Sequence, residues 1–237
     1  MNSNCVKCKV VRKICRTPEG KGPLNCPTEN EIVIINMAME RYADPAIHEF
    51  ARMASVQEGE CYADRDKKPY VLNPVKPRIV EIIEFAQKMN FTRIGLAFCG
   101  GLTHEAGIVV DILEKHEFKV INVSCKIGGI PKEKIGVKDS EKINTGNHES
   151  MCNPIGQALI LNQENTDFNV LLGLCVGHDS LFLKYVAAPT TILAVKDRVT
   201  GHNPLAAVYT ANSYYARLKR LEFGSDEEMK ARLVAGK

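Results

Sequence analysis

Two patterns of apolar and polar positions divide the chain. Up to about residue 90, apolar side chains recur every three or four positions, which is typical of helices with one buried face. Thr28 with Glu31 forms a capping-box pattern, and Asp44 followed by Pro45 is a common helix start. The spacing and these caps predict three helices, at 29–42, from 45 onward and at 78–90.

From Arg93 onward the pattern changes to short, almost wholly apolar runs that are separated by helical stretches. The runs are RIGLAFC, FKVINVSC, FNVLLGLC and TTILAVKD. Strands of this kind are buried on both faces, and their alternation with helices indicates a parallel sheet. We therefore predict an α/β fold with a doubly wound, mainly parallel sheet of four to five strands.

Helices are expected to connect these strands. They are predicted from GGLTHEAG through Lys115, at 154–163, over DSLFLKYV and from Pro204 to Leu221. A short exposed helix is expected in the tail, where Ser225 and Glu228 form a capping pattern. The predicted organisation is a cysteine-rich metal-binding segment with helices at 1–73, a Rossmann-like α/β domain at 74–222 and a tail at 223–237.

The composition fits a cytoplasmic globular protein. The 237 residues are 45% hydrophobic and 25% charged, which is too apolar for a disordered chain. No uncharged apolar run approaches the roughly 18 residues that a membrane span requires, and the N-terminus shows no signal-peptide pattern. The net charge of +3 is too balanced to indicate nucleic acid as a partner. The oligomeric state is left open.

Nine cysteines change the picture, because an odd number cannot pair completely within one chain. In a reducing cytosol, cysteines more often bind metal or perform chemistry than form disulfides. Cys99, Cys125 and Cys175 each end a predicted strand. In the flavodoxin-like strand order the Cys99 strand lies between the other two, and neighbouring strands are about 4.8 Å apart.

A fourth thiol is expected at the same edge of the sheet. Cys152 lies just before the helix predicted at 154–163, whose N-terminus favours a thiolate. Four thiols from four segments predict a bound iron–sulfur cluster of the 4Fe–4S type, with a tetrahedral zinc ion as the other fit. The alternative interpretation is that each cysteine is a small buried apolar side chain.

Histidine and cationic side chains follow the same strand ends. His178 lies three residues after Cys175, and Lys196, Arg198 and His202 follow the fourth strand. They are ordinary loop residues on one interpretation. On the other they are catalytic residues, which move protons and either bind an anionic substrate or offset the charge of a cluster.

A second set of cysteines lies within the first 26 residues. Cys5 and Cys8 form a CxxC chelating pair, and Cys15 and Cys26 bring the set to four. Four such cysteines predict a metal site. Their spacing matches neither two zinc-ribbon knuckles nor a ferredoxin run, so it does not identify the metal, and zinc is one candidate. A redox CxxC with incidental neighbours is the alternative.

The chain resembles an uncharacterised family generically described as metal-binding proteins. It is the domain-of-unknown-function family number eighteen forty-seven, found mainly in anaerobic bacteria and methanogenic archaea. The motifs that carry the resemblance are CVKCKVVRKIC, RIGLAFCGGL, VSCKIGGI, MCNPIGQA, GLCVGHDSLF and VKDRVTGHNPLAAVY. The similarity extends from Cys5 to about Leu218 and implies metal binding without assigning a reaction. The motif cysteines that it implies as ligands are Cys5, Cys8, Cys15, Cys26, Cys99, Cys125, Cys152 and Cys175.

The favoured function is a metal-binding, iron–sulfur protein with redox or sulfur-related chemistry on a small molecule, and whether it is an enzyme is left open. The alternative is a non-catalytic metal-binding, electron-transfer or redox-sensing protein that acts with a redox partner protein and carries structural zinc at its N-terminus. A metal-free thiol enzyme, with Cys175–His178 or Cys152–His148 as its pair, leaves six cysteines unexplained. An RNA-binding knuckle is disfavoured because no aromatic residue occurs among the first 40 residues.

Overall fold

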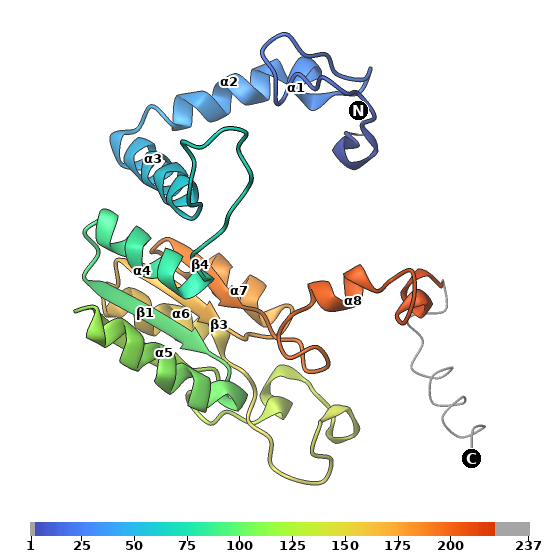
Figure 1. The fold of residues 1–237 in the computed structure, drawn as a ribbon. Helices are drawn as coiled ribbons and strands as arrows, with labels where there is room; N and C mark the ends of the chain where they lie inside the picture. The colour runs from blue at the N-terminus through green and yellow to red at the C-terminus, as the bar shows by residue number, and fades with distance from the viewer. Residues whose placement is uncertain (1–2, 221–237) are drawn as a thin grey trace. The chain divides into compact units, whose positions relative to one another are not determined.

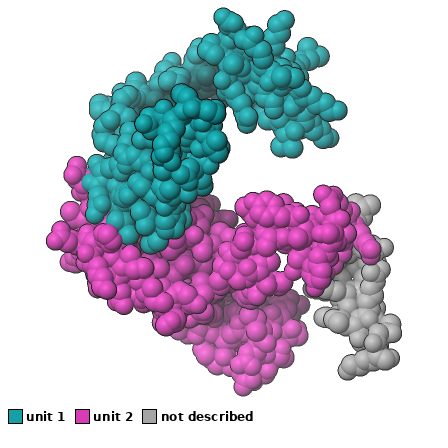
Figure 2. Space-filling model, viewed as in Figure 1, with its two compact units in different colours: residues 1–89 teal, residues 90–237 magenta. Residues whose placement is uncertain are grey.

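A computed structural model describes residues 3–220 of the chain. The chain forms two compact units, and the division falls between Met89 and Asn90 (Figure 2). Among the described residues, no helix is both long enough and apolar enough to cross a membrane.

The first unit is helical. Its elements are a 3-10 turn at Cys5–Lys7 and the helices α1 (Pro27–Asn30), α2 (Ile32–Arg41), α3 (Pro45–Glu60) and α4 (Arg78–Lys88). Asp44 caps α3 as expected, because its carboxylate accepts hydrogen bonds from the backbone N–H groups of Ala46 and Ile47 at 2.9 and 3.1 Å. The buried Gln57 joins α3 to α4 by donating to Glu84 at 2.7 Å and accepting from Lys88 at 2.6 Å.

The helix predicted at 29–42 is wrong in its first turns. The structure has two helices here, separated at Glu31, whose φ of −113° and ψ of 37° are not helical. The N-cap of α1 is Cys26 rather than Thr28. The carboxylate of Glu29 accepts a hydrogen bond from the backbone N–H of Gly22 at 2.8 Å, so α1 is bound to the preceding loop and does not continue into α2.

The second unit is built on a four-stranded, all-parallel sheet within its described residues, which confirms the predicted α/β class. The strands are β1 (Arg93–Phe98), β2 (Lys119–Ser124), β3 (Phe168–Leu172) and β4 (Thr190–Ala194). Their order is β2-β1-β3-β4, so the strand before Cys99 lies between the strands that precede Cys125 and Cys175.

Helices cover both faces of this sheet (Figure 1). They are α5 (Thr103–Lys115), α6 (Pro154–Gln163) and α7 (His178–Tyr185). The connection from β1 to β2 runs in one direction across the sheet, and those from β2 to β3 and from β3 to β4 run in the other. Since crossovers between parallel strands are right-handed, α5 lies on one face and α6 with α7 on the other.

The core explains why the strands are apolar along their whole length. Every residue of β3 is buried, and in β1 only Arg93 is not. The largest fully buried side chains of this unit include Ile94, Leu96, Leu113, Leu161, Leu171 and Phe182. Side chains on both faces of the two central strands are therefore buried under helices, whereas most residues of β2 and β4 are only partly buried or exposed.

The closing helix predicted from Pro204 to Leu221 is also wrong. The structure has a short helix, α8 (Leu205–Tyr209), then turns and a 3-10 helix at Ala216–Lys219. Neither element has a buried residue, so no packed face stabilises a longer helix. The capping pattern at Ser225 and Glu228 lies outside the described residues.

Candidate functional site

The carboxyl ends of β1, β2 and β3 are level with one another. Phe98, the last residue of β1, pairs with Ser124 of β2 and with Leu172 of β3. Cys99 and Cys125 directly follow their strands, and their backbone N–H groups continue the ladder by donating to Leu172 at 3.0 Å and to Phe98 at 2.9 Å. The two thiols therefore start from neighbouring positions on one edge of the sheet.

A long loop returns Cys152 to the same edge. The segment between Cys125 and α6 extends beyond the strand ends before it turns back (Figure 1). The backbone N–H of Asn153 donates to the carbonyl of Cys125 at 2.7 Å, while its side chain caps α6 by accepting from Gly156 at 2.9 Å. The same residue thus starts the helix and fixes the adjacent Cys152 beside the end of β2.

Three thiols meet here, with Cys125 in the middle. Cys125 is only 2% exposed, and it makes side-chain hydrogen bonds with both Cys99 and Cys152. Its sulfur also accepts a hydrogen bond from the backbone N–H of Gly100 at 3.3 Å. We call Cys99, Cys125 and Cys152 the thiol trio.

The contacts within the trio separate the acidities of its members. The neighbouring sulfurs of Cys152 and Cys99, together with burial, raise the pKa of Cys125 far above its ordinary value. The hydrogen bond from Cys125, the backbone N–H of Gly101 and Lys196 lower the pKa of Cys99 to about 5. The hydrogen bond from Cys125, Lys126 and His178 lower the pKa of Cys152 to about 5. The single S–H of Cys125 is thus shared between two flanking sulfurs, and the three groups titrate together.

Cys175 has a different neighbour. It lies three residues beyond the end of β3, and its sulfur accepts a hydrogen bond from the Arg198 guanidinium at 3.2 Å. The interactions that set the pKa values of the trio do not include it. Of the four thiols expected at this edge, the structure brings three into contact and holds the fourth against an arginine.

The other predicted site residues divide in the same way. His178 acts on Cys152, and Lys196 lies beside Cys99. Arg198 contacts Cys175. His202 instead accepts a hydrogen bond through Nδ1 from the backbone N–H of Asp197 at 3.1 Å. Its placement is explained by the geometry of its own loop.

Sequence reasoning missed two residues at this edge. Lys126 lies beside Cys152 and donates to the carbonyl of Ser150 at 2.6 Å, and its position directly after Cys125 was a readable signal. Gln157, which is fully buried, donates to the carbonyls of Phe98 at 3.1 Å and Val123 at 2.7 Å. It binds the ends of β1 and β2 together, and only its polar character within an apolar helix could have indicated this.

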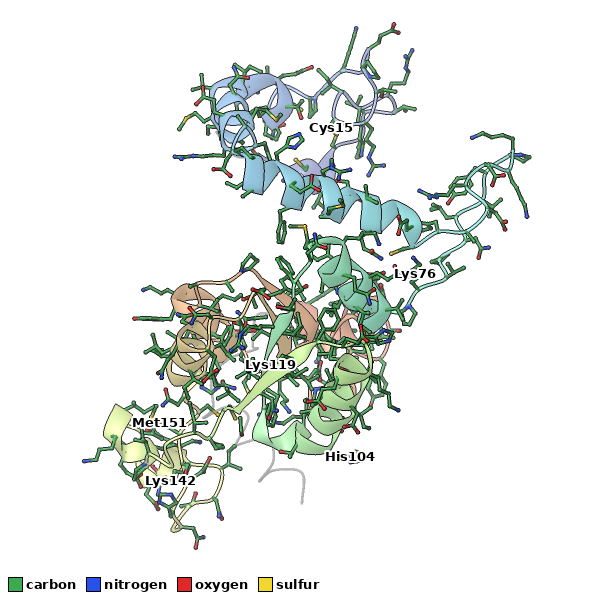
Figure 3. The ribbon with its side chains drawn as sticks, turned by 90° about the vertical axis from the view of Figure 1, so that its left-hand side faces the viewer. Cys15, Lys76, His104, Lys119, Lys142 and Met151 are labelled. Carbon is green, nitrogen blue, oxygen red and sulfur yellow. The ribbon has the colours of Figure 1, made fainter. Side chains whose placement is uncertain are left out.

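The N-terminal cysteines are not brought together in the same way. Cys5 and Cys15 are exposed, Cys8 is half-buried and Cys26 is buried at the start of α1 (Figure 3, which labels Cys15). Within residues 3–220, no three histidine, cysteine or acidic side chains, those of the thiol trio included, are grouped so that they could hold a metal ion. The metal site expected at these four cysteines stays a prediction.

Comparison with known proteins places the chain in a family. A family described as "Protein of unknown function (DUF1847)" matches residues 26–193. The chain belongs to this family. An uncharacterised protein of Methanocaldococcus jannaschii is 54% identical over 146 residues, which are 62% of this chain and 72% of that protein. No solved structure gives a significant match.

The DUF1847 match includes the thiol trio and Cys175. It begins at Cys26, so it leaves out Cys5, Cys8 and Cys15, and it ends before Lys196 and Arg198. The part of the chain that the family description covers is therefore the α/β layer with its strand-end thiols, together with the helices that precede it.

Proposed function

We propose that this DUF1847 protein is a metal-binding protein whose thiol trio holds an iron–sulfur cluster, at which redox or sulfur-related chemistry takes place. The observation that carries the proposal is the contact of Cys125 with both Cys99 and Cys152, which come from three separate segments of the chain. Structural packing alone does not require three thiols at one point on the edge of a sheet.

As the structure has them, the three side chains are not grouped to hold a metal ion, but the chemistry of the donors fits such a group. Thiolate is the ligand that iron–sulfur clusters take, and it is also a ligand of zinc. The pKa values of Cys99 and Cys152, lowered to about 5, supply two thiolates at neutral pH. Binding requires the sulfurs to move apart from direct contact, because sulfur–metal bonds of about 2.3 Å place the metal between them. It also removes the proton of Cys125.

The residues around the trio support chemistry on a small molecule. His178, whose charge acts on Cys152, is the candidate for transferring protons at this edge. Because Cys175 is held by Arg198, the proposal assigns three protein ligands and leaves a coordination position for a substrate. Such a centre would act as a Lewis acid when it is loaded. A second site, with zinc at Cys5, Cys8, Cys15 and Cys26, belongs to the proposal as a structural clip.

Elemental analysis of the full chain tests the proposal. The protein is purified anaerobically, and iron, zinc and acid-labile sulfide are measured per chain together with the visible spectrum. We expect about four irons and four sulfides per chain. Cys125→Ser should lose both, and Cys61→Ser, which changes another buried thiol, should keep both. Iron-free protein, or equal loss in the two variants, would contradict the proposal.

A second function is favoured by the hydrogen bonds within the trio. A buried thiol beside two cysteines of lowered pKa is also suited to thiol–disulfide exchange without metal. In that reaction a thiolate of the trio would attack a disulfide of a partner, one sulfur of the partner would leave as a thiolate, and a mixed disulfide would form. Protein that carries no metal, yet exchanges with a small disulfide through Cys99 or Cys152, would favour this function over the first.

The open coordination position distinguishes the catalytic form of the proposal from electron transfer or redox sensing without catalysis. A purely electron-transferring centre changes oxidation state without binding an added ligand. A shift of the visible spectrum of the loaded protein on addition of a small thiol would favour the catalytic form of the proposal. An unchanged spectrum would favour exchange of electrons with a partner protein.

A further inference from the structure

Three cationic side chains lie around the thiol trio and Cys175, and none of the three is paired with a carboxylate in the described part of the chain. They are Lys126, Lys196 and Arg198, which we call the cationic rim. Within residues 3–220, no aspartate or glutamate forms an ion pair with any of them. The rim therefore sets three positive charges against the two thiolates of Cys99 and Cys152, with no carboxylate paired to any of the three.

The pairing is different in the adjoining loop. Lys132 forms an ion pair with Glu149, and Lys142 forms ion pairs with Glu133 and Asp139. Carboxylates are thus available in this part of the chain, and they are bound by lysines that lie away from the thiols. The absence of carboxylate partners at the rim is therefore a property of the rim and not of the unit as a whole.

The acid nearest in sequence to the rim is bound within its own loop. Asp197 lies between Lys196 and Arg198, but its carboxylate accepts hydrogen bonds from the backbone N–H groups of Val199 at 2.9 Å and Thr200 at 3.0 Å. These bonds fix the turn after β4. They leave the two flanking cations to extend toward the thiols.

The path of Lys196 crosses the end of β3. It follows β4, yet its ammonium group lies beside Cys99, which follows β1. Gly173, at the end of β3, has a φ of +66°, and a Cβ atom there would lie 3.8 Å from Cε of Lys196 and 2.2 Å from Cδ1 of Leu102. A Cβ at this position would collide with the end of the Leu102 side chain and would only touch the lysine stem, so the positive φ and the Leu102 contact are what favour glycine here.

The two cations of this loop end at different thiols. Lys196 reaches Cys99, and Arg198 donates to Cys175 at 3.2 Å through one of its five N–H groups. One loop thus brings an ammonium and a guanidinium to the ends of two neighbouring strands. A guanidinium and an ammonium at one edge are the groups that bind oxyanions, the guanidinium in a bidentate way.

We infer that Lys196 and Arg198 bind the oxyanion group of a small anionic substrate beside the thiol trio. The inference deepens the proposed function, since it names the class of molecule on which the thiol centre acts. It rests on the positions and charges of the two side chains, whichever metal the trio holds.

Two alkylating reagents that differ in charge test the inference directly. The reduced, chelator-treated full chain is reacted with iodoacetate, which is an anion, or with iodoacetamide, which is neutral. In both reactions a thiolate displaces iodide, and the modified Cys99 is quantified by mass spectrometry of its peptide. The ratio of the two rate constants cancels any change in the ionisation of the thiol, so it reports the local attraction for an anion.

We expect this ratio at Cys99 to exceed that of free glutathione by about tenfold at low ionic strength, and to fall as salt is added. The double variant Lys196→Gln/Arg198→Gln should bring the ratio to within about twofold of glutathione. The matched control is Lys119→Gln, an exposed lysine at the opposite end of β2, and it should leave the ratio unchanged. Figure 3 labels Lys119.

A ratio equal to that of glutathione in the unaltered chain would overturn the inference, as would equal losses in the double variant and in Lys119→Gln. If circular dichroism shows that the double variant does not fold, the single variant Arg198→Gln, at an exposed position, replaces it. In that variant the ratio of the two rate constants must fall at least twofold. Metal analysis of the same preparations separates the two claims. An anion preference without metal overturns the proposed function alone, and metal without an anion preference overturns this inference alone.

Discussion

At the scale of single residues, the site depends on Cys125. Its burial and its two sulfur neighbours keep its proton in place, and that proton stabilises the thiolates of Cys99 and Cys152. The sequence predicted the positions of Cys99 and Cys125, because a wholly apolar run ends at each of them. It could not predict which cysteine would be central or that Arg198 would hold Cys175, since both depend on side-chain contacts between segments that are remote in sequence.

These contacts give the reduced, metal-free protein a defined pH dependence. The pKa values of Cys99 and Cys152 are lowered from 9.0 to about 5, so the folded chain favours their ionised forms. Their contribution to the free energy of unfolding is complete above pH 9 and is lost as the pH falls through about 5. The rate of Cys99 alkylation by iodoacetamide should accordingly fall with a midpoint near pH 5.

Removal of the central thiol should shift that midpoint upward. Cys125→Ala deletes the strongest of the groups that lower the pKa of Cys99, while Lys196 and the N–H of Gly101 remain. The pH profile of Cys99 alkylation measures the shift, and Cys61→Ala provides a control at a buried thiol elsewhere. A midpoint that does not move in Cys125→Ala would show that Cys125 does not set the acidity of its neighbour.

At the scale of elements, α6 positions the site through Gln157. Pro154 and the apolar spacing predicted the bounds of this helix, and they are confirmed. The pattern could not show that a glutamine would point into the core and bind the carbonyls of Phe98 and Val123 at the ends of two strands. A polar side chain in an apolar stretch has many local solutions, and only the tertiary structure selects one.

Gln157→Met tests this link. The substitution keeps the size of the side chain but leaves the carbonyl of Val123 without this donor, so the free energy of unfolding should fall by about 1–3 kcal/mol. Urea unfolding of the full chain measures the change. The exposed Gln163→Met on the same helix should change the free energy of unfolding by less than about 0.5 kcal/mol. Equal effects of the two variants would contradict a positioning role for Gln157.

The loop between β2 and α6 is organised around one lysine. The Lys142 side chain is 4% exposed, and it bonds to the carboxylates of Glu133 and Asp139 and, at 2.9 Å, to the carbonyl of Asn147. Figure 3 labels Lys142 and, further along the same loop, Met151, the residue before Cys152. No apolar periodicity marks this segment, which is why the sequence did not predict its structure.

Lys142→Met should therefore loosen the loop that returns Cys152 to the trio. Limited proteolysis should cleave between residues 131 and 150 faster than in the unaltered chain, whereas the exposed Lys134→Met should not change the rate. Lys142 lowers the pKa of both Glu133 and Asp139, so the loop is stabilised above their ordinary pKa values of 4.5 and 3.8 and loses this contribution as the pH falls below them. Cleavage in the unaltered chain should accelerate on acidification through the same range.

At the scale of the whole molecule, the α/β class followed from the alternation of apolar runs with helices, and the flavodoxin-like strand order assumed for it is the one observed. The misjudged helices lie at 29–42 and 204–221, where apolar residues recur but no packed face holds a continuous helix. The structure divides the chain between Met89 and Asn90, and each cysteine set lies in a different unit. The two proposed metal sites should therefore load independently.

Cys8→Ser tests that independence. We expect it to lower the zinc content while the iron and sulfide contents stay at those of the unaltered chain. Inductively coupled plasma analysis of anaerobically purified protein measures both metals in one sample. Loss of iron together with zinc would show that the two sets of cysteines do not act separately.

The central claim is that sulfurs from three segments form one centre and that Cys175 stands outside it. Iron and sulfide analysis of Cys99→Ser, Cys152→Ser and Cys175→Ser, each purified anaerobically as the full chain, tests it most directly. Cys99→Ser and Cys152→Ser should lose the same iron and sulfide although 53 residues separate the two positions (152 − 99), while Cys175→Ser should retain both. Retention in either of the first two variants, or loss in Cys175→Ser alone, would contradict the account.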